Sequence, residues 1–146
     1  MIVHATLDML GRKRDHLAPS HADFHPMNIF ISGNERVSAI DIDKFCQDAP
    51  EADVGWFLMQ TAAFDFFESG SFERSAGARS AFLEKYRSDA AQRIDPKRVG
   101  AYMARAFLKN LHFETVLLET GSDRLVKPWL AGARTAIFDG NLCLCA

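Results

Sequence analysis

Residues 21–43 read HADFHPMNIFISGNERVSAIDID. Within this stretch, residues 28–32 (NIFIS) and 36–41 (RVSAID) are short runs rich in β-branched side chains, and Gly33-Asn34 between them is typical of a tight turn. The pattern predicts a β-hairpin. The segment ahead of Asn28 is then a loop, and the hairpin folds its own far end back beside that loop.

Helical patterns fill the rest of the chain on both sides of the hairpin. Before it, residues 2–16 predict a short helix that Pro19 ends. After it, the pairs Ser69-Gly70, Asp95-Pro96 and Gly121-Ser122 are cap and turn residues that separate four helical patterns. These four patterns cover residues 52–69, 72–89, 96–120 and 123–138.

The order of elements predicts an α+β fold that is mostly helical. With 146 residues, of which 48% are hydrophobic, the chain is long enough for one core and too short for two ordinary domains. We therefore expect a single domain over residues 1–146. Its expected parts are a loop at 20–28, the hairpin at 28–41, a second loop at 41–43 and a helical part at 52–140.

Composition excludes several classes of partner. The formal net charge is −2 and no dense basic cluster occurs, so we expect no nucleic-acid partner. No apolar run approaches the length of a membrane span, and charged residues soon follow the apolar N-terminus, so we expect neither a membrane segment nor a signal peptide. The three cysteines fit a reducing compartment, and we expect a cytoplasmic protein. Cys143 and Cys145 favour an ordinary apolar C-terminus over a metal site, which would need further ligands.

The loop at 20–28 concentrates polar side chains directly ahead of the first predicted strand. Asp23 and Asn28 lie there, and Asp41 follows at the end of the hairpin. Phosphoryl transfer requires a carboxylate at the acceptor hydroxyl and oxygen ligands for the Mg²⁺ that bridges the phosphates. Together with His21, these residues follow the kinase order of H-x-D, four residues, Asn and a later metal-binding Asp. The spacing therefore favours phosphoryl transfer of the kinase type, with Mg²⁺ at the phosphates.

The chain resembles a known family in three segments, HADFHPMNIFI, VSAIDID and APEADVGWFL. They are similar to the catalytic loop, the metal-binding loop and the start of the following helix in aminoglycoside phosphotransferases and in choline or homoserine kinases. The resemblance covers roughly residues 20–58. It implies the large C-terminal lobe of a protein-kinase-like fold. It also implies transfer of the γ-phosphate of ATP, with Mg²⁺, to a hydroxyl group of a small molecule.

The same resemblance implies roles for individual residues. Asp23 would be the catalytic base or the group that orients the acceptor hydroxyl. Asn28 and Asp41 would bind Mg²⁺ and the nucleotide, and Asp43 would be an accessory metal ligand. The residues that would support the site structurally are His21, His25 and Asp53, the last as a buried carboxylate that braces the catalytic loop.

The chain departs from the family pattern in two ways. Ala22 and Met27 stand where the family usually has glycine, and a side chain strains the loop at either place if the backbone needs a positive φ. We also expect no counterpart of the family's small ATP-binding lobe in this sequence, which leaves Lys13 and Lys44 as cations that could touch phosphate. Because the surface under that lobe would be apolar, we expect a homodimer or a partner chain that covers it.

Two other functions stay open from the sequence. One is a truncated, inactive or split-enzyme module that acts as a binding or assembly partner. The other is a metal-dependent hydrolase with zinc or a dinuclear centre, because imidazole and carboxylate groups suit such metals. Its ligands would be His21, Asp23, His25, Asp41 and Asp43.

The phosphate acceptor also stays open. An aminoglycoside, choline or another metabolite with a hydroxyl group fits the sequence equally well. Acidic residues on the predicted helices are either partners for a cationic acceptor or a solvated helix face. Trp56 and the aromatic residues that follow it are interpreted as core rather than as a ligand platform. The acidic residues in question are Asp65, Glu68, Glu114, Glu119 and Asp123.

Overall fold

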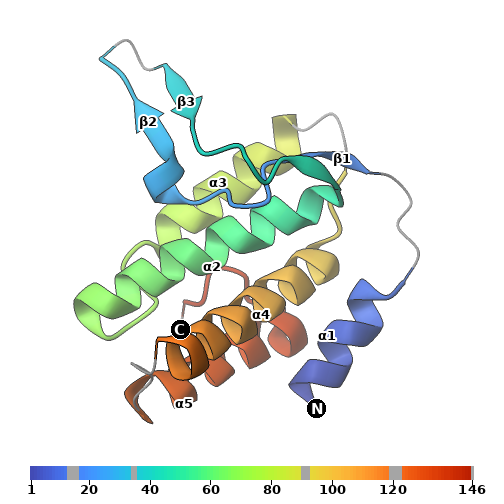
Figure 1. Cartoon of the computed structure of the whole chain (residues 1–146), viewed down its shortest axis with the longest axis vertical. Helices are drawn as coiled ribbons and strands as arrows, with labels where there is room; N and C mark the ends of the chain where they lie inside the picture. The colour runs from blue at the N-terminus through green and yellow to red at the C-terminus, as the bar shows by residue number, and fades with distance from the viewer. Residues whose placement is uncertain (13–16, 34–35, 90–92, 119–122, 146) are drawn as a thin grey trace.

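The computed structural model describes residues 1–12, 17–33, 36–89, 93–118 and 123–145 (Figure 1). Helices dominate and the strands are short, which confirms the predicted α+β, mostly helical class. The α-helices are α1 (Ile2–Leu10), α2 (Pro50–Ser69), α3 (Ala76–Asp89), α4 (Pro96–His112) and α5 (Asp123–Arg134). The strands are β1 (Ala18–Ser20), β2 (Ile29–Ile31), β3 (Val37–Ala39) and β4 (Cys46–Asp48). Three short turns complete the order: the 3₁₀ turn η1 (Pro26–Asn28) and the π turns η2 (Phe113–Leu117) and η3 (Thr135–Asp139).

The strands form two separate antiparallel pairs. β2 pairs with β3, with Phe30 opposite Ser38, and this confirms the predicted hairpin. β1 pairs with β4, with Pro19 opposite Gln47. This second pair shows that the prediction of a continuous loop ahead of Asn28 is wrong. Strands of three residues are too short to show an alternating pattern, and Pro19 is tolerated because a two-stranded ladder leaves one edge of each strand free.

The hydrophobic core lies between α2, α4 and α5. Leu58, Met103 and Trp129, one from each helix, have no exposed surface. Helices α2 and α4 approach closely at Gly55, where an added Cβ would lie 2.7 Å from the Cβ of Tyr102. Helix α1 packs against α4, and α3 runs beside α2 (Figure 1). Strand β1 and the turn η1 contact α2, whereas the β2–β3 hairpin projects away from the helices (Figure 1), so α2 connects the core with the loop region.

The aromatic residues of α2 are only partly in the core. Phe66 is buried and packs edge-on against Trp129, with 5.0 Å between the ring centres. Phe64 and Phe67 expose 39% and 54% of their surface, so the interpretation of the whole stretch as core is wrong. Adjacent residues of a helix point to different faces, and only one face of α2 meets α4 and α5.

A buried ion pair sets the start of α3. The Asp65 carboxylate accepts hydrogen bonds from the backbone N–H and the hydroxyl of Ser75, both at 2.7 Å. It also lies 2.8 Å from Nη1 of Arg79, whose side chain has no exposed surface. The helix therefore begins at Ala76 and not near residue 72 as predicted, because the preceding turn is held by Asp65.

The other helix ends follow local signals more closely. The predicted cap of α4 is confirmed, since Asp95 Oδ1 accepts a hydrogen bond of 2.9 Å from the N–H of Lys97. Helix α1 ends at Leu10, short of the predicted end, and residues 13–16 lie outside the described part. Helices α4 and α5 end earlier than predicted because each continues as a π turn.

Within the described ranges, no helix combines the length and apolar character that a membrane crossing requires.

The three cysteines are unpaired. The backbone carbonyl of Cys143 accepts hydrogen bonds from Nε of Arg79 at 3.1 Å and from Nη2 at 2.8 Å, which ties the C-terminal segment to α3.

Candidate functional site

The first turn of α2 holds the loop that follows β1. The Asp53 carboxylate accepts hydrogen bonds from the backbone N–H of His21 at 2.7 Å and of Ala22 at 2.9 Å, one on each oxygen. Ala22 has a φ of +62°, in the left-handed region that glycine favours, whereas Met27 lies in η1 and has no positive φ. Of the two residues that stand where the family usually has glycine, only Ala22 therefore strains the loop. Asp53 is partly exposed, not buried as expected, because it lies at the helix end beside the pocket described below.

Hydrogen bonds also tie this loop to the far end of the hairpin. Asn28 Nδ2 donates to the carbonyl of Asp23 at 3.1 Å, and the Asn28 carbonyl accepts from the N–H of Ile40 at 3.0 Å. His21 Nε2 lies 2.8 Å from the carbonyl of Ile40, so this nitrogen donates. Because Ile40 directly precedes Asp41, the bonds hold Asp41 next to the loop. Asn28 is buried, and no described residue donates to its Oδ1, which leaves that oxygen available.

Asp23 is part of an ion pair. Lys44 Nζ lies 2.6 Å from Asp23 Oδ2, and His25 Nε2 lies 3.9 Å from Oδ1. Burial raises the pKa of Asp23, but the hydrogen bond and charge of Lys44, with contributions from His25 and Lys109, outweigh burial and lower the pKa below its ordinary value. The contact with Asp23 in turn raises the pKa of Lys44. Asp23 is therefore a carboxylate at neutral pH.

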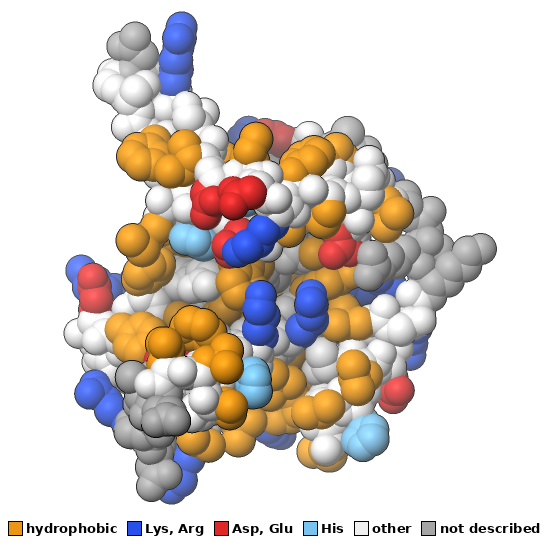
Figure 2. Space-filling view, in the orientation of Figure 1, with side chains coloured by type: hydrophobic (Ala, Val, Ile, Leu, Met, Phe, Trp, Pro, Cys, Tyr) orange, Lys and Arg blue, Asp and Glu red, His pale blue; other side chains and the backbone are white. Residues whose placement is uncertain are grey.

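Asp41 and Asp43 form an exposed carboxyl pair beside Asp23. A hydrogen bond with Asp43 and the charge of Asp43 raise the pKa of Asp41, and the same hydrogen bond lowers the pKa of Asp43. Figure 2 shows acidic and basic side chains together on the face below the β2–β3 hairpin. Since two ionised carboxylates repel each other, a cation at this position is stabilising.

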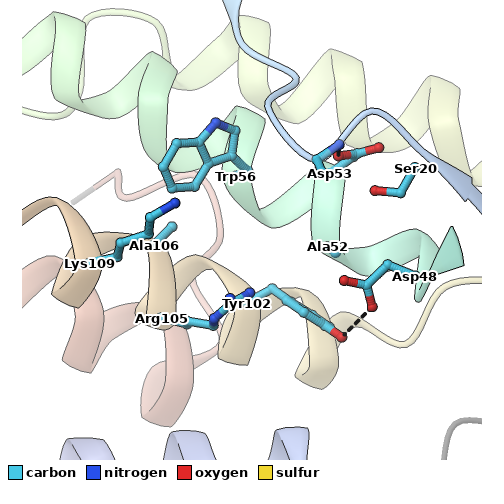
Figure 3. A pocket seen from close by; sticks show the side chains of 10 residues that line it. Ser20, Asp48, Ala52, Asp53, Trp56, Tyr102, Arg105, Ala106 and Lys109 are labelled. Atoms are coloured by element: carbon cyan, nitrogen blue, oxygen red, sulfur yellow. Dashed lines mark hydrogen bonds between the residues drawn. The ribbon is translucent and has the colours of Figure 1, made fainter. Parts of the chain in front are cut away.

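A pocket of about 130 Å³ opens beside the loop, between α2 and α4 (Figure 3). At one end Lys109 points to the ring of Trp56, with Nζ 4.8 Å from the ring centre, a cation–π contact. Arg105 lines the same side, one helical turn earlier on α4. At the other end, the Tyr102 hydroxyl donates to Asp48 Oδ1 at 3.4 Å. The wall on the side of the loop is formed by Ser20, Ala22 and Asp53.

The described acidic residues considered as partners for a cationic acceptor lie elsewhere. Asp65 is bound to buried Arg79, and Glu68 forms an ion pair with Arg74. Glu114 lies in η2, beyond the end of α4, and does not line the pocket. The remaining candidates, Glu119 and the side chain of Asp123, lie outside the described residues, as does Lys13.

Metal binding by protein side chains alone has no support in the geometry. Across the side chains that the structure describes, no three or more His, Cys, Asp or Glu residues are grouped to hold a metal ion. Zinc and dinuclear hydrolase centres need such a group, so nothing in the geometry favours the hydrolase interpretation. Mg²⁺ differs, because it often binds one or two carboxylates together with substrate phosphates and water. Asp41, Asp43 and Oδ1 of Asn28 are oxygen donors that fit this ion.

Comparison of the chain with protein-family models, with curated proteins and with solved structures found no match. The suggested family therefore depends on the residues of the loop, the hairpin and the start of α2 alone.

The pair of cations in the pocket was not predicted as part of a site. A signal exists in hindsight, because Arg105 and Lys109 are four residues apart and so share one face of a helix. The sequence does not indicate that this face lies beside the loop, since the packing of α4 on α2 determines it. Likewise, the sequence did not indicate that Lys44, one of the two lysines that could touch phosphate, pairs with Asp23.

Proposed function

We propose that this chain is the catalytic lobe of a kinase-type phosphotransferase, which transfers the γ-phosphate of ATP, with Mg²⁺, to a hydroxyl group of a small molecule. The observation that carries the proposal is the hydrogen-bonded link from Asp23 through Asn28 to Ile40, next to Asp41. Phosphoryl transfer needs a hydroxyl-orienting carboxylate and metal ligands in one place, and this link supports such an arrangement.

In this proposal Asp23 orients the acceptor hydroxyl. Its pKa is lowered, so it is ionised at neutral pH and accepts a hydrogen bond from the hydroxyl group. A loose transition state requires position more than strong basicity, so a low pKa is compatible with this role. The side chain of Lys44 is 62% exposed, which allows it to leave Asp23 and follow a phosphate oxygen.

Asp41 and Oδ1 of Asn28 would hold Mg²⁺, with Asp43 as the accessory ligand. When bound, Mg²⁺ neutralises charge on the phosphate groups. The chain is prepared for a cation here, because the proximity of Asp43 raises the pKa of Asp41 and a divalent ion relieves the repulsion between them.

The proposal extends to the fold and to the assembly. The order of a helix, a loop, a hairpin and further helices supports the large lobe of a protein-kinase-like fold. Apolar side chains on the hairpin and just before and after it are exposed, Ile31 by 75%, which supports a second copy or a partner chain on this side. Unpaired cysteines fit a cytoplasmic setting. The exposed apolar residues are Met27, Phe30, Ile31, Val37, Ile40, Ile42 and Phe45.

Calorimetric titration of MgATP tests the proposal, with the oligomeric state measured on the same samples. We expect MgATP to bind the unaltered chain and to lose binding in Asp41→Ala. The matched control Glu84→Ala removes an exposed carboxylate of α3 and should bind like the unaltered chain. Equal binding to the unaltered chain and to Asp41→Ala contradicts the proposed site. Absence of binding in a folded sample favours the alternative of an assembly module or half of a split enzyme.

A further inference from the structure

Two cations of α4 lie beside the loop, and none of the described acidic residues forms an ion pair with them. Arg105 and Lys109 are exposed and line the pocket between α2 and α4. Neither forms an ion pair with any residue in the described ranges. Guanidinium and ammonium groups bind carboxylate and phosphate oxygens through charge-assisted hydrogen bonds. The pocket therefore offers free donors to an anion.

The two carboxylates of the pocket are already bound by the protein. Asp53 accepts from the N–H groups of His21 and Ala22. Asp48 accepts from the N–H of Ala49 at 2.7 Å and from the hydroxyl of Tyr102. These bonds offset the negative charge locally, so a cationic ligand finds no unbound carboxylate here.

The cationic end of the pocket has a defined shape. The ring of Trp56 holds the ammonium group of Lys109 at 4.8 Å from its centre. The small side chains of Ala52 and Ala106 line the pocket and leave space between α2 and α4. The volume of about 130 Å³ is roughly ten times the minimum for one ordered water, which suits a small anionic group and a few carbon atoms.

The pocket adjoins Asp23. Ala22 lines it and directly precedes Asp23 in the chain. The charge of Lys109 is among those that lower the pKa of Asp23, so the two side chains are near enough to interact electrostatically. A small ligand bound through its anion can therefore present a hydroxyl group toward Asp23.

We infer that the phosphate acceptor is a small hydroxyl compound that carries a carboxylate or a phosphate, and that Arg105 and Lys109 bind this anionic group. The transfer of phosphate to this compound depends on the proposed function, but the binding of its anionic group by Arg105 and Lys109 does not. In the reaction, the hydroxyl oxygen forms a bond to the γ-phosphorus of ATP while the bond to the β–γ bridging oxygen breaks. ADP leaves, and the hydroxyl proton passes to Asp23 and then to water. Among the acceptors that the sequence leaves open, an anionic hydroxyl compound then fits better than a cationic one.

Four related probes test the inference by calorimetry on the full chain, with and without MgATP. Glycerate carries a carboxylate, glycerol 3-phosphate a phosphate, choline a cation, and glycerol only hydroxyl groups. We expect one of the two anions to bind at least tenfold more tightly than choline or glycerol, and the better anion identifies the group. Arg105→Gln and Lys109→Gln should each weaken that binding by roughly tenfold. The control Lys97→Gln removes an exposed lysine at the start of the same helix and should leave binding unchanged.

The outcomes separate this inference from the proposed function. Anion binding that needs Arg105 and Lys109, in a chain that does not bind MgATP, supports the anion site and overturns the phosphotransferase. MgATP binding without binding of either anion overturns the anion site and leaves the phosphotransferase. Binding of choline as tight as that of the anions also overturns the anion site. If the two Gln variants weaken MgATP and not the anion, the cations serve the nucleotide and the inference is wrong.

Discussion

Replacing Asp53 by alanine should release the loop at residues 20–28 from α2. Two hydrogen bonds, of 2.7 and 2.9 Å, end on this carboxylate. A hydrogen bond to a charged group contributes about 1.5–3 kcal/mol, and water compensates part of the loss because Asp53 is partly exposed, so we expect a loss of about 2–4 kcal/mol. Ala22 makes the loop more sensitive, since its left-handed backbone costs about 1–2 kcal/mol and these contacts hold it in place.

Urea unfolding measures this loss, and amide hydrogen exchange locates it. In Asp53→Ala the amides of His21 and Ala22 should exchange about 30 to 900 times faster, which is the same free energy expressed as a rate ratio. Asp53→Asn keeps one acceptor oxygen, so its stability and its amide exchange rates should lie between those of the unaltered chain and those of Asp53→Ala. Glu84→Ala, which removes an exposed carboxylate, should stay within about 0.5 kcal/mol of the unaltered chain. A loss below about 1 kcal/mol with unchanged exchange at both amides would refute the bracing role of Asp53.

Three further changes have equally specific outcomes. Lys44→Met should raise the pKa of Asp23, because burial then acts without its main opposing charge; a carboxyl NMR titration that shows no change would contradict the ion pair. Asp65→Ala leaves a buried arginine unpaired and should cost about 3–5 kcal/mol in urea unfolding. Burial raises the pKa of Asp65, but its bonds to that arginine and to Ser75 outweigh burial, so the folded pKa is lowered. The stabilisation from Asp65 is therefore complete above its unfolded pKa of about 3.9 and disappears as the pH falls through the folded value, which unfolding curves at several pH values should show. Gly55→Ala forces α2 away from α4 and should cost about 1–3 kcal/mol, whereas Gly77→Ala, which meets no atom within 4 Å, should be neutral or slightly stabilising by the same measurement.

The hairpin and the helices were predictable because their signals are local. Gly33 and the β-branched runs on either side of it identify the hairpin without any tertiary contact. Asp95 ahead of Pro96 identifies the start of α4 in the same way. The grouping of Asp23, Asn28 and Asp41 followed from the hairpin alone, since a hairpin returns the chain to its starting point.

The features that were missed depend on contacts distant in sequence. β1 and β4 stabilise each other only after the hairpin has brought them together, so neither three-residue strand stands out in the sequence. The start of α3 depends on Asp65, which lies one helix earlier. Arg105 and Lys109 belong to the pocket only because α4 packs against α2 at Gly55.

The pairing of β1 with β4 has a consequence for how the site responds to heat. Ser20 lies opposite Cys46, so residues 21–45 form one closed loop whose ends are held by a ladder of three residue pairs. Such a short ladder opens at a much lower free energy than the helical core, as a sub-global unit in its own right. Asp23, Asn28 and Asp41 then move away from α2 and its pocket as one unit, and the affinity for a ligand that contacts both the loop and the pocket falls by the fraction of chains that are open. On warming, binding should disappear while far-ultraviolet circular dichroism still shows intact helices.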